Sequence, residues 1–126
     1  MIRFIYTSKI APTLDHQDLK NIIQSARKYN QQNDITGLLI SNFEYFFQVL
    51  EGPEQHVAAL YEKIKVDSRH LGIHLLSQEE VNNRLFPDWK MGYLTFPLED
   101  PPIIKTDWTK LTTEECDKIL RRVVPK

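Results

Sequence analysis

Strand-like and helix-like segments follow one another along this chain in an order that leaves few possible folds. Strands are predicted from β-branched, aromatic or alternating apolar residues, and helices from apolar residues spaced three and four apart. The predicted strands cover about residues 2–8, 35–41, 45–51, 73–79 and 90–96, and the predicted helices about 15–30 and 54–66. This βαββαββ order contains the ferredoxin-like βαββαβ core. We therefore expect an α+β fold, with a mixed five-stranded sheet and both helices on one face.

The ends of these segments carry residues that such elements need. Asp15 or His16 lies near the start of the first helix, whose apolar stripe consists of Leu19, Ile22, Ile23 and Ala26. Only Asn42-Phe43-Glu44 separates the second and third strands, which is short enough for an antiparallel hairpin. Pro53 suits the first turn of the second helix, because its missing N–H needs no partner there.

A third helix is predicted beyond the fifth strand. Thr112 and Glu115 have the spacing of a capping box, and the helix that follows to about Val124 has an apolar stripe of Cys116, Ile119, Leu120 and Val123. We expect this stripe to cover the sheet face opposite the other helices, where burial is needed for Ile5, Phe47 and Val49. The chain thus divides into a core at residues 1–97 and a C-terminal extension with a helix at 98–126.

Composition excludes several classes of protein. The 126 residues are enough for one domain, and the formal net charge of −1 offers no basic surface for nucleic acid or an anionic membrane. The N-terminus lacks the apolar run of a leader, so we expect a cytoplasmic protein, in keeping with its single cysteine. No cysteine or carboxylate completes a ligand set with His70 and His74, so no metal site is predicted.

Three polar side chains fall at positions that otherwise have the pattern of a core. Gln48 lies inside a strand-like run, Tyr6 shares one side of the first strand with Ile2 and Phe4, and Asn30 falls at helical spacing on the first helix's apolar stripe. Ordinary alternatives exist: Gln48 bonded to backbone or water, Tyr6 reaching solvent, and Asn30 as a helix cap. If both strands turn these residues toward the helices, Tyr6 and Gln48 are neighbours and Asn30 approaches the same groove. Their convergence favours a bound planar, polar ligand.

Five segments, in order, resemble one known family. They are Ile5-Tyr6-Thr7-Ser8, Asn33-Asp34-Ile35-Thr36-Gly37-Leu38-Leu39, Phe47-Gln48-Val49-Leu50-Glu51-Gly52, Asp67-Ser68-Arg69-His70 and Phe86-Pro87-Asp88-Trp89-Lys90-Met91-Gly92. They span nearly all of residues 1–96 and together resemble the BLUF domain, the family of flavin-binding blue-light sensors. The resemblance implies that residues 1–97 form a photosensory domain that binds flavin non-covalently. FAD is the expected cofactor, with FMN and riboflavin as alternatives.

The resemblance also implies roles at matching positions. Tyr6 matches the tyrosine that gives an electron and a proton toward the photoexcited flavin, and Gln48 the glutamine between that tyrosine and the ring. Asn30 matches the asparagine that hydrogen-bonds the ring's polar edge. Trp89 and Met91 match a pair on the last strand whose positions respond to light, although both are also common packing residues.

The other implied positions surround the flavin. Ile22 and Ile23 match aliphatic residues near the ring, and positions near its sugar chain are matched by Asp67, Arg69 and His70. Lys63 stands where many relatives have arginine, so a two-point phosphate contact becomes a single charge. This departure leaves the choice among the three flavins open.

Three functional interpretations follow. The first is a short blue-light receptor, not an enzyme, that signals through a downstream protein or through self-association as a homo-oligomer. The second is a photosensory module excised from a light-regulated cyclase or phosphodiesterase. The third is a ferredoxin-like enzyme of the acylphosphatase kind, but the sequence lacks the expected phosphate-binding loop with an arginine and an asparagine. The sequence favours a sensor.

Overall fold

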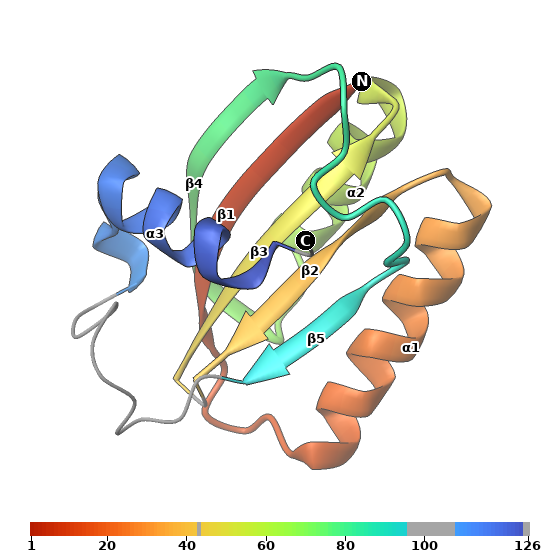
Figure 1. Ribbon diagram of the computed structural model, residues 1–126. Coiled ribbons are helices and arrows are strands. Elements are labelled where there is room, and N and C mark those ends of the chain that lie inside the picture. The colour runs from red at the N-terminus through yellow and green to blue at the C-terminus, as the bar shows by residue number, and fades with distance from the viewer. Residues whose placement is uncertain (43, 96–107, 125–126) are drawn as a thin grey trace.

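A mixed five-stranded sheet forms the centre of the computed structural model, which describes residues 1–42, 44–95 and 108–124 (Figure 1). The strands are β1 (Ile2–Ile10), β2 (Thr36–Ser41), β3 (Tyr45–Gly52), β4 (His70–Glu80) and β5 (Gly92–Thr95). The helices are α1 (His16–Gln32), α2 (Glu54–Lys65), the short 3-10 helix η1 (Trp108–Lys110) and α3 (Thr113–Val123). The sheet order is β4-β1-β3-β2-β5, with β5 parallel to β2 and the other neighbours antiparallel. The expected ferredoxin-like α+β fold is confirmed.

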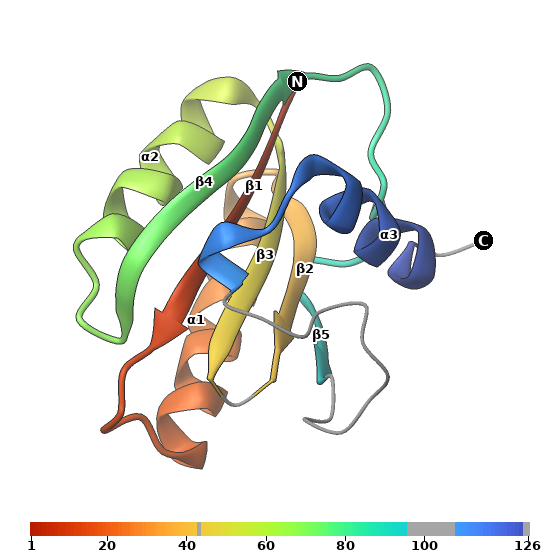
Figure 2. The ribbon, with the colours of Figure 1, turned by 90° about the vertical axis from the view of Figure 1, so that its left-hand side faces the viewer.

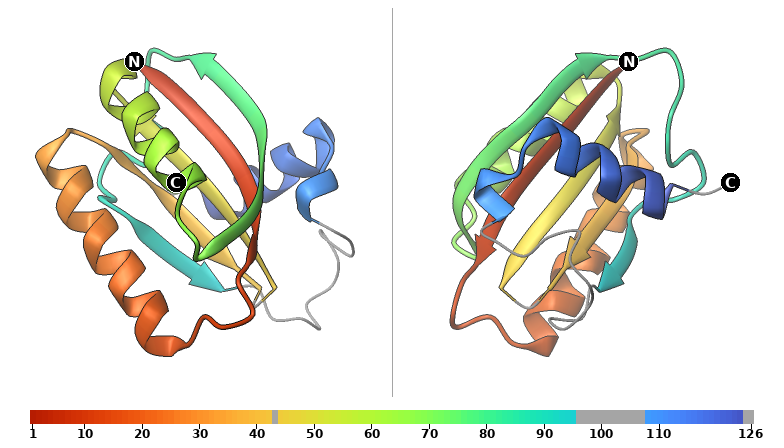
Figure 3. Two further views of the ribbon diagram at one scale, coloured as in Figure 1. Left: turned by 180° about the vertical axis from the view of Figure 1, so that it is seen from behind. Right: turned by 60° about the vertical axis from the view of Figure 1, so that its left-hand side comes forward.

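The helices cover both faces of this sheet. α1 and α2 lie on one face, which we call the near face, and α3 crosses the opposite or far face (Figures 2 and 3). The near-face core is formed from the sheet mainly by Ile2, Phe4, Tyr6, Leu39, Phe46 and Leu50. The far-face core is formed from the sheet by Ile5, Leu38, Ile40, Phe47 and Val49. Alternation along each strand thus separates the two cores as predicted.

α1 begins where its sequence supplies a cap. The Asp18 N–H donates to the Asp15 carboxylate at 2.8 Å, and the Asp15 N–H donates to the Asp18 carboxylate at 3.1 Å. This reciprocal box satisfies two N–H groups that the helix itself cannot pair. The predicted apolar stripe then packs against the near-face core through Leu19, Ile22, Ile23 and Ala26. α2 begins after Pro53 and buries Val57, Leu60 and Tyr61.

α3 closes the far face. Thr112 and Glu115 form the predicted capping box, and the buried side chains of the helix are Cys116, Ile119 and Val123. These pack in one cluster with Ile5, Phe47 and Val49, so the predicted position of the C-terminal helix is confirmed. Burial raises the pKa of the Cys116 thiol to about 11, which keeps it protonated at neutral pH.

Three strand boundaries differ from those predicted by two residues or more, and the first is the end of β1, which lies at Ile10 rather than at about residue 8. β4 starts at His70 rather than at about residue 73, because β1 continues to Ile10 and pairs with His70. Gly72 lies within this extension at a φ of 57°, a conformation that glycine adopts without steric cost. β5 starts at Gly92 rather than at about residue 90, because the residues before it turn and the Trp89 N–H donates to the Phe86 carbonyl. Trp89 and Met91 therefore precede the last strand.

Two expectations concern positions without a structural description. The proposed boundary at residues 97 and 98 and the hairpin residue Phe43 lie outside the described residues. In the part of the chain described above, no helix combines the length and hydropathy that a transmembrane segment requires.

Candidate functional site

Tyr6 and Gln48 meet at the centre of the near face. β1 and β3 pair in the register that sets these two residues opposite each other. Tyr6 is fully buried, and Gln48 is 5% exposed. The Tyr6 hydroxyl donates to Gln48 Oε1, and Gln48 Nε2 donates to the Met91 sulfur at 3.6 Å. The three side chains therefore form one continuous hydrogen-bonded chain between sheet and helices.

The surroundings of Tyr6 keep its phenol protonated. Burial is the main cause that raises the pKa of Tyr6 well above 10.0, and the neighbouring Tyr61 hydroxyl adds to the effect. The two rings pack edge to face with centroids 5.3 Å apart. Because ionisation is so unfavourable here, the phenol gives up its proton only when some other change makes it much more acidic.

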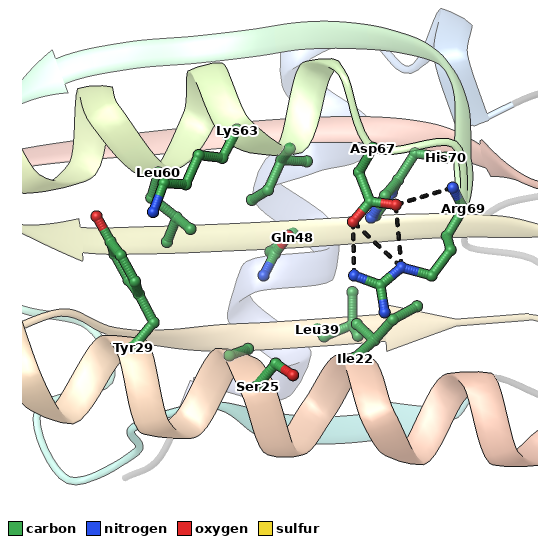
Figure 4. A pocket seen from close by; sticks show the side chains of 12 residues that line it. Ile22, Ser25, Tyr29, Leu39, Gln48, Leu60, Lys63, Asp67, Arg69 and His70 are labelled. Atoms are coloured by element: carbon green, nitrogen blue, oxygen red, sulfur yellow. Dashed lines mark hydrogen bonds and ion pairs between the residues drawn. The ribbon is translucent and has the colours of Figure 1, made fainter.

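A pocket of about 250 Å³ opens beside Gln48, between α1 and α2 (Figure 4). Its apolar wall on α1 includes Ile22 and Ala26, and the wall on α2 includes Leu60 and Ile64. Gln48 of β3 and Leu39 of β2 line it from the centre of the sheet, and His70 lines it from the start of β4. A slot with aliphatic sides and one central amide suits a flat ring system with a polar edge.

The end of this pocket next to β4 is charged and polar. Arg69 donates to both carboxylate oxygens of Asp67, with a closest contact of 2.6 Å (Figure 4). These hydrogen bonds lower the pKa of the Asp67 carboxyl, so it stays ionised. His70 Nδ1 lies 2.9 Å from Ser8 Oγ, and burial lowers the pKa of His70 to about 4. His70 is therefore neutral at pH 7.

The other end of the pocket carries an exposed cation. Lys63 Nζ lies 4.6 Å from the centre of the Tyr29 ring, across the opening between the helices. Such a contact holds the ammonium group near the pocket without using its hydrogen-bond donors. Lys63 is thus available as a single positive charge for an anionic group.

Side chains of α1 hold the segment that carries Met91. Asn30 is fully buried, and its Nδ2 donates to the Lys90 carbonyl at 2.5 Å. Arg27 Nε donates to the Met91 carbonyl at 3.0 Å. Asn30 Oδ1 is buried and has no hydrogen-bond partner among the residues that the structure describes. An acceptor left in this state is costly, so a donor from a ligand would stabilise it.

Residues 1–92 match the BLUF family, described as sensors of blue-light using FAD. The chain belongs to this family. The blue light- and temperature-regulated antirepressor BluF of Escherichia coli (strain K12) is 39% identical over 69 residues, which are 55% of this chain and 17% of that protein. A photoactivated adenylate cyclase subunit beta-like protein FB of Euglena gracilis is 32% identical over 91 residues, or 71% of this chain and 11% of that protein.

A solved BLUF-like structure has nearly the same extent as this chain. The BlsA ground state superposes with a TM-score of 0.88 at 27% identity, covering 99% of this chain and 88% of that chain. By contrast, the chain spans only 17% and 11% of the two curated relatives. The match to those proteins therefore covers a small part of each.

The BLUF pocket contains some of the residues predicted from sequence and not others. Those that line it are Ile22, Gln48, Lys63, Asp67, Arg69 and His70. Tyr6 lies beside Gln48 on the neighbouring strand, Asn30 lies one helical turn beyond Ala26, and Ile23 packs against the near-face core. Met91 reaches Gln48, whereas Trp89 stacks on Phe86 in the far-face cluster with ring centres 5.5 Å apart. The implied pair thus separates onto different faces.

Several lining residues were not predicted as site residues. They are Ser25, Ala26, Tyr29, Leu39, Leu60 and Ile64. Ser25 and Ala26 follow Ile22 by three and four residues, and Leu60 precedes Lys63 by three, so helical spacing from predicted lining residues could have indicated these three. Leu39 carries no such signal. Among the residues that the structure describes, no group of three histidine, cysteine or acidic side chains could hold a metal ion.

Proposed function

We propose that this protein is a blue-light sensor whose flavin ring binds in the pocket between α1 and α2. The observation that carries the proposal is the buried chain of hydrogen bonds from Tyr6 through Gln48 to Met91, which borders that pocket. Such a chain joins a redox-active phenol to an amide that can exchange its donor and acceptor ends, and then to the side chain of Met91, which precedes β5. An ordinary core has no need of this arrangement, because apolar residues of similar shape avoid the cost of burying polar groups.

The residues of the pocket fit a flavin. Ile22 and Ile23 on α1 supply aliphatic contact for the ring, and the unpaired Asn30 Oδ1 is an acceptor for a ring N–H. The charged end with Asp67, Arg69 and His70 suits the hydroxyl-rich sugar chain. Lys63 lies at the opposite end of the pocket, so the phosphate contact that the resemblance implies for it does not fit a sugar chain placed beside Asp67. We propose FAD as the natural cofactor, in line with the family description. FMN and riboflavin would meet the same ring contacts.

Tyr6 and Gln48 carry the proton chemistry. When bound, a flavin supplies light absorption and an excited state that takes an electron from a nearby phenol. The Tyr6 hydroxyl already donates to Gln48 Oε1, so a phenol made acidic by electron loss has an acceptor in place. The Gln48 amide exchanges its donor and acceptor ends by rotation or tautomerisation. Since Gln48 Nε2 also bonds to Met91, either change alters that second contact and so reaches the segment before β5.

The output is carried by association rather than catalysis. We propose that a downstream protein or a second copy of the chain, in the cytoplasm, reads the altered segment. BluF is an antirepressor, and the Euglena relatives are cyclase subunits. Because the chain matches only a small part of those proteins, a photosensory module of a longer light-regulated enzyme is the second candidate. The length of the natural gene product distinguishes these two.

An absorption spectrum recorded before and after blue light tests the sensor function. We expect a yellow protein whose bands shift to longer wavelength by a small amount and return in darkness. The Gln48→Leu variant should keep its flavin, because leucine fills a similar volume, but should lose the shift for want of a hydrogen bond. A colourless protein that cannot be reconstituted with any flavin would refute the proposal.

A further inference from the structure

A carboxylate lies completely buried on the far face, three residues along β3 from Gln48. Glu51 has an exposed fraction of 0%. Its Oε2 accepts from Arg3 Nε at 2.8 Å, and its oxygens accept from the Leu85 and Phe86 N–H groups at 2.9 Å. A buried carboxylate is tolerated only while such partners are retained. One side chain of β3 therefore fixes the start of the segment 85–91.

The same segment is fixed again at its other end, by three consecutive carbonyls. The donor–acceptor pairs are Gly37 N–H to Trp89 at 2.9 Å, Asn30 Nδ2 to Lys90 at 2.5 Å and Arg27 Nε to Met91 at 3.0 Å. From this end the Met91 side chain extends to Gln48. The position of the Met91 sulfur is thus set by attachments at both ends of one short segment.

We propose that Glu51 is a positioning residue of the light response, which holds segment 85–91 where Met91 meets Gln48 and thereby sets the rate of return to the dark state. The inference rests on the proposed function. Gln48 and Glu51 belong to the same strand, one facing near and the other far, so β3 is a common reference for the amide and for the segment that it contacts.

The rate of return to the dark state depends on how often Met91 lies beside Gln48. Return to the dark arrangement is faster with the sulfur beside Gln48, so its rate rises with the fraction of time that the segment holds this position. With Leu85 and Phe86 released from Glu51, the segment samples other positions and that fraction falls. A group that only stabilised the fold would change unfolding and leave the rate of return unaltered.

The first test compares Glu51→Gln with wild type in the full chain. Glu51 Oε1 accepts from both the Leu85 and the Phe86 N–H, and Oε2 accepts from Arg3 Nε. The NH2 group of the amide must therefore face a donor, either Arg3 or the two backbone N–H groups, and the attachment of segment 85–91 weakens. We expect dark recovery to slow by at least about threefold. In flavin-free protein, hydrogen exchange of the Leu85 and Phe86 amides should accelerate. If Glu51→Gln does not fold, Glu51→Asp keeps the charge and shortens the reach, with the same expected changes.

Glu79→Gln is the matched control. Glu79 is the exposed partner of the same Arg3, at 3.3 Å, and it does not bond to segment 85–91. Its substitution removes an equal charge beside the same guanidinium group. Dark recovery and exchange at positions 85 and 86 should match wild type.

A double-mutant cycle with Met91→Leu separates positioning from general stabilisation. Leucine keeps the volume but removes the sulfur acceptor, so Glu51→Gln should cause no further slowing in that background. Equal slowing in both backgrounds, or recovery of Glu51→Gln within about 1.5-fold of wild type, would overturn the inference. A wild-type protein that binds no flavin or shows no light-induced shift would overturn the proposed function and this inference with it.

Discussion

The near and far faces of the sheet bury similar aliphatic side chains, but their buried polar groups differ in charge and in hydrogen-bond partners. On the near face, Tyr6 and Gln48 are neutral groups whose hydrogen bonds can be rearranged without leaving a charge unpaired. On the far face, the buried polar group of β3 is the Glu51 carboxylate, which is held by a guanidinium and two backbone N–H groups. One strand therefore carries an adjustable contact on one side and a fixed one on the other.

The difference indicates how a small domain combines movement with stability. Hydrogen bonds between neutral groups contribute little net free energy, so exchanging them is inexpensive. Bonds to a buried charge are costly to lose. The helices show the same contrast. Around the pocket, the apolar residues of α1 are only partly buried, whereas Ile119 of α3 is fully buried on the far face.

The largest expected effect comes from removing the Tyr6 hydroxyl. Tyr6→Phe keeps the ring packing, so flavin should remain bound, but the light-induced spectral shift should be lost because no proton donor to Gln48 remains. Light-minus-dark difference spectra measure this. Tyr61→Phe, which alters the adjacent near-face tyrosine, is the control and should retain the shift. Normal switching by Tyr6→Phe would contradict the role assigned to this residue.

A far-face substitution should affect stability and leave photochemistry unchanged. Ile119 is fully buried in α3, so Ile119→Ala should lower the free energy of unfolding by about 2–5 kcal/mol. Denaturant unfolding measures this loss, and the exposed Lys118→Ala serves as the control, with an effect within about 0.5 kcal/mol. In the folded fraction the spectral shift should be intact. A lost shift would show that the two faces are not separable in this way.

The third prediction is a pH dependence that originates on the near face. The folded protein lowers the pKa of His70 from 6.5 to about 4, so below pH 6.5 the unfolded chain binds a proton that the folded state does not. Stability should therefore fall as the pH drops from 6.5 toward 4, by roughly 3 kcal/mol in flavin-free protein. His70→Gln should remove this component from unfolding measured across the range. An unchanged pH profile in His70→Gln would assign the dependence to other groups.

The smallest effect concerns flavin retention at Asn30. Asn30→Ala removes the buried Oδ1 acceptor and the bond to the Lys90 carbonyl, which should weaken flavin binding by about 1–3 kcal/mol. Flavin occupancy after dialysis measures the change. Asn33→Ala removes a comparable amide from the same end of α1, where it bonds to the Tyr29 carbonyl, and should have no effect on binding. Equal losses of flavin in both variants would show that Asn30→Ala acts by destabilising the end of α1 and not by removing a flavin contact.

Sequence periodicity predicted the pairing of Tyr6 with Gln48 correctly. Side chains alternate along each strand, and the order of elements makes β1 and β3 neighbours, so the apolar patterns that turn Tyr6 and Gln48 toward the helices place both on one face. The register that sets them opposite each other comes from the structure. The stripe of α3 was equally informative, because an amphipathic helix after a half-covered sheet has one apolar surface available.

Periodicity could not predict the path of residues 81–91. This stretch has neither strand nor helix spacing, and its position is set by side chains from distant elements, chiefly Glu51 and Asn30. For that reason the sequence assigns no role to Glu51, and it predicts Trp89 and Met91 as a pair on the last strand although the Trp89 ring lies in the far-face cluster. The need for glycine at position 92 also comes from a contact that periodicity does not reveal, since a Cβ there would lie 2.3 Å from the Trp89 ring.

The reactivity of Cys116 with thiol reagents can measure how firmly α3 is held against the sheet. It is the only cysteine of the sequence, it lies 5% exposed between α3 and the sheet, and its thiol pKa is about 11. Thiol reagents react with the thiolate of an accessible cysteine. Labelling at neutral pH therefore proceeds through conformations in which this helix has left the sheet. Its rate in light and in darkness reports how often the helix detaches, without any introduced probe.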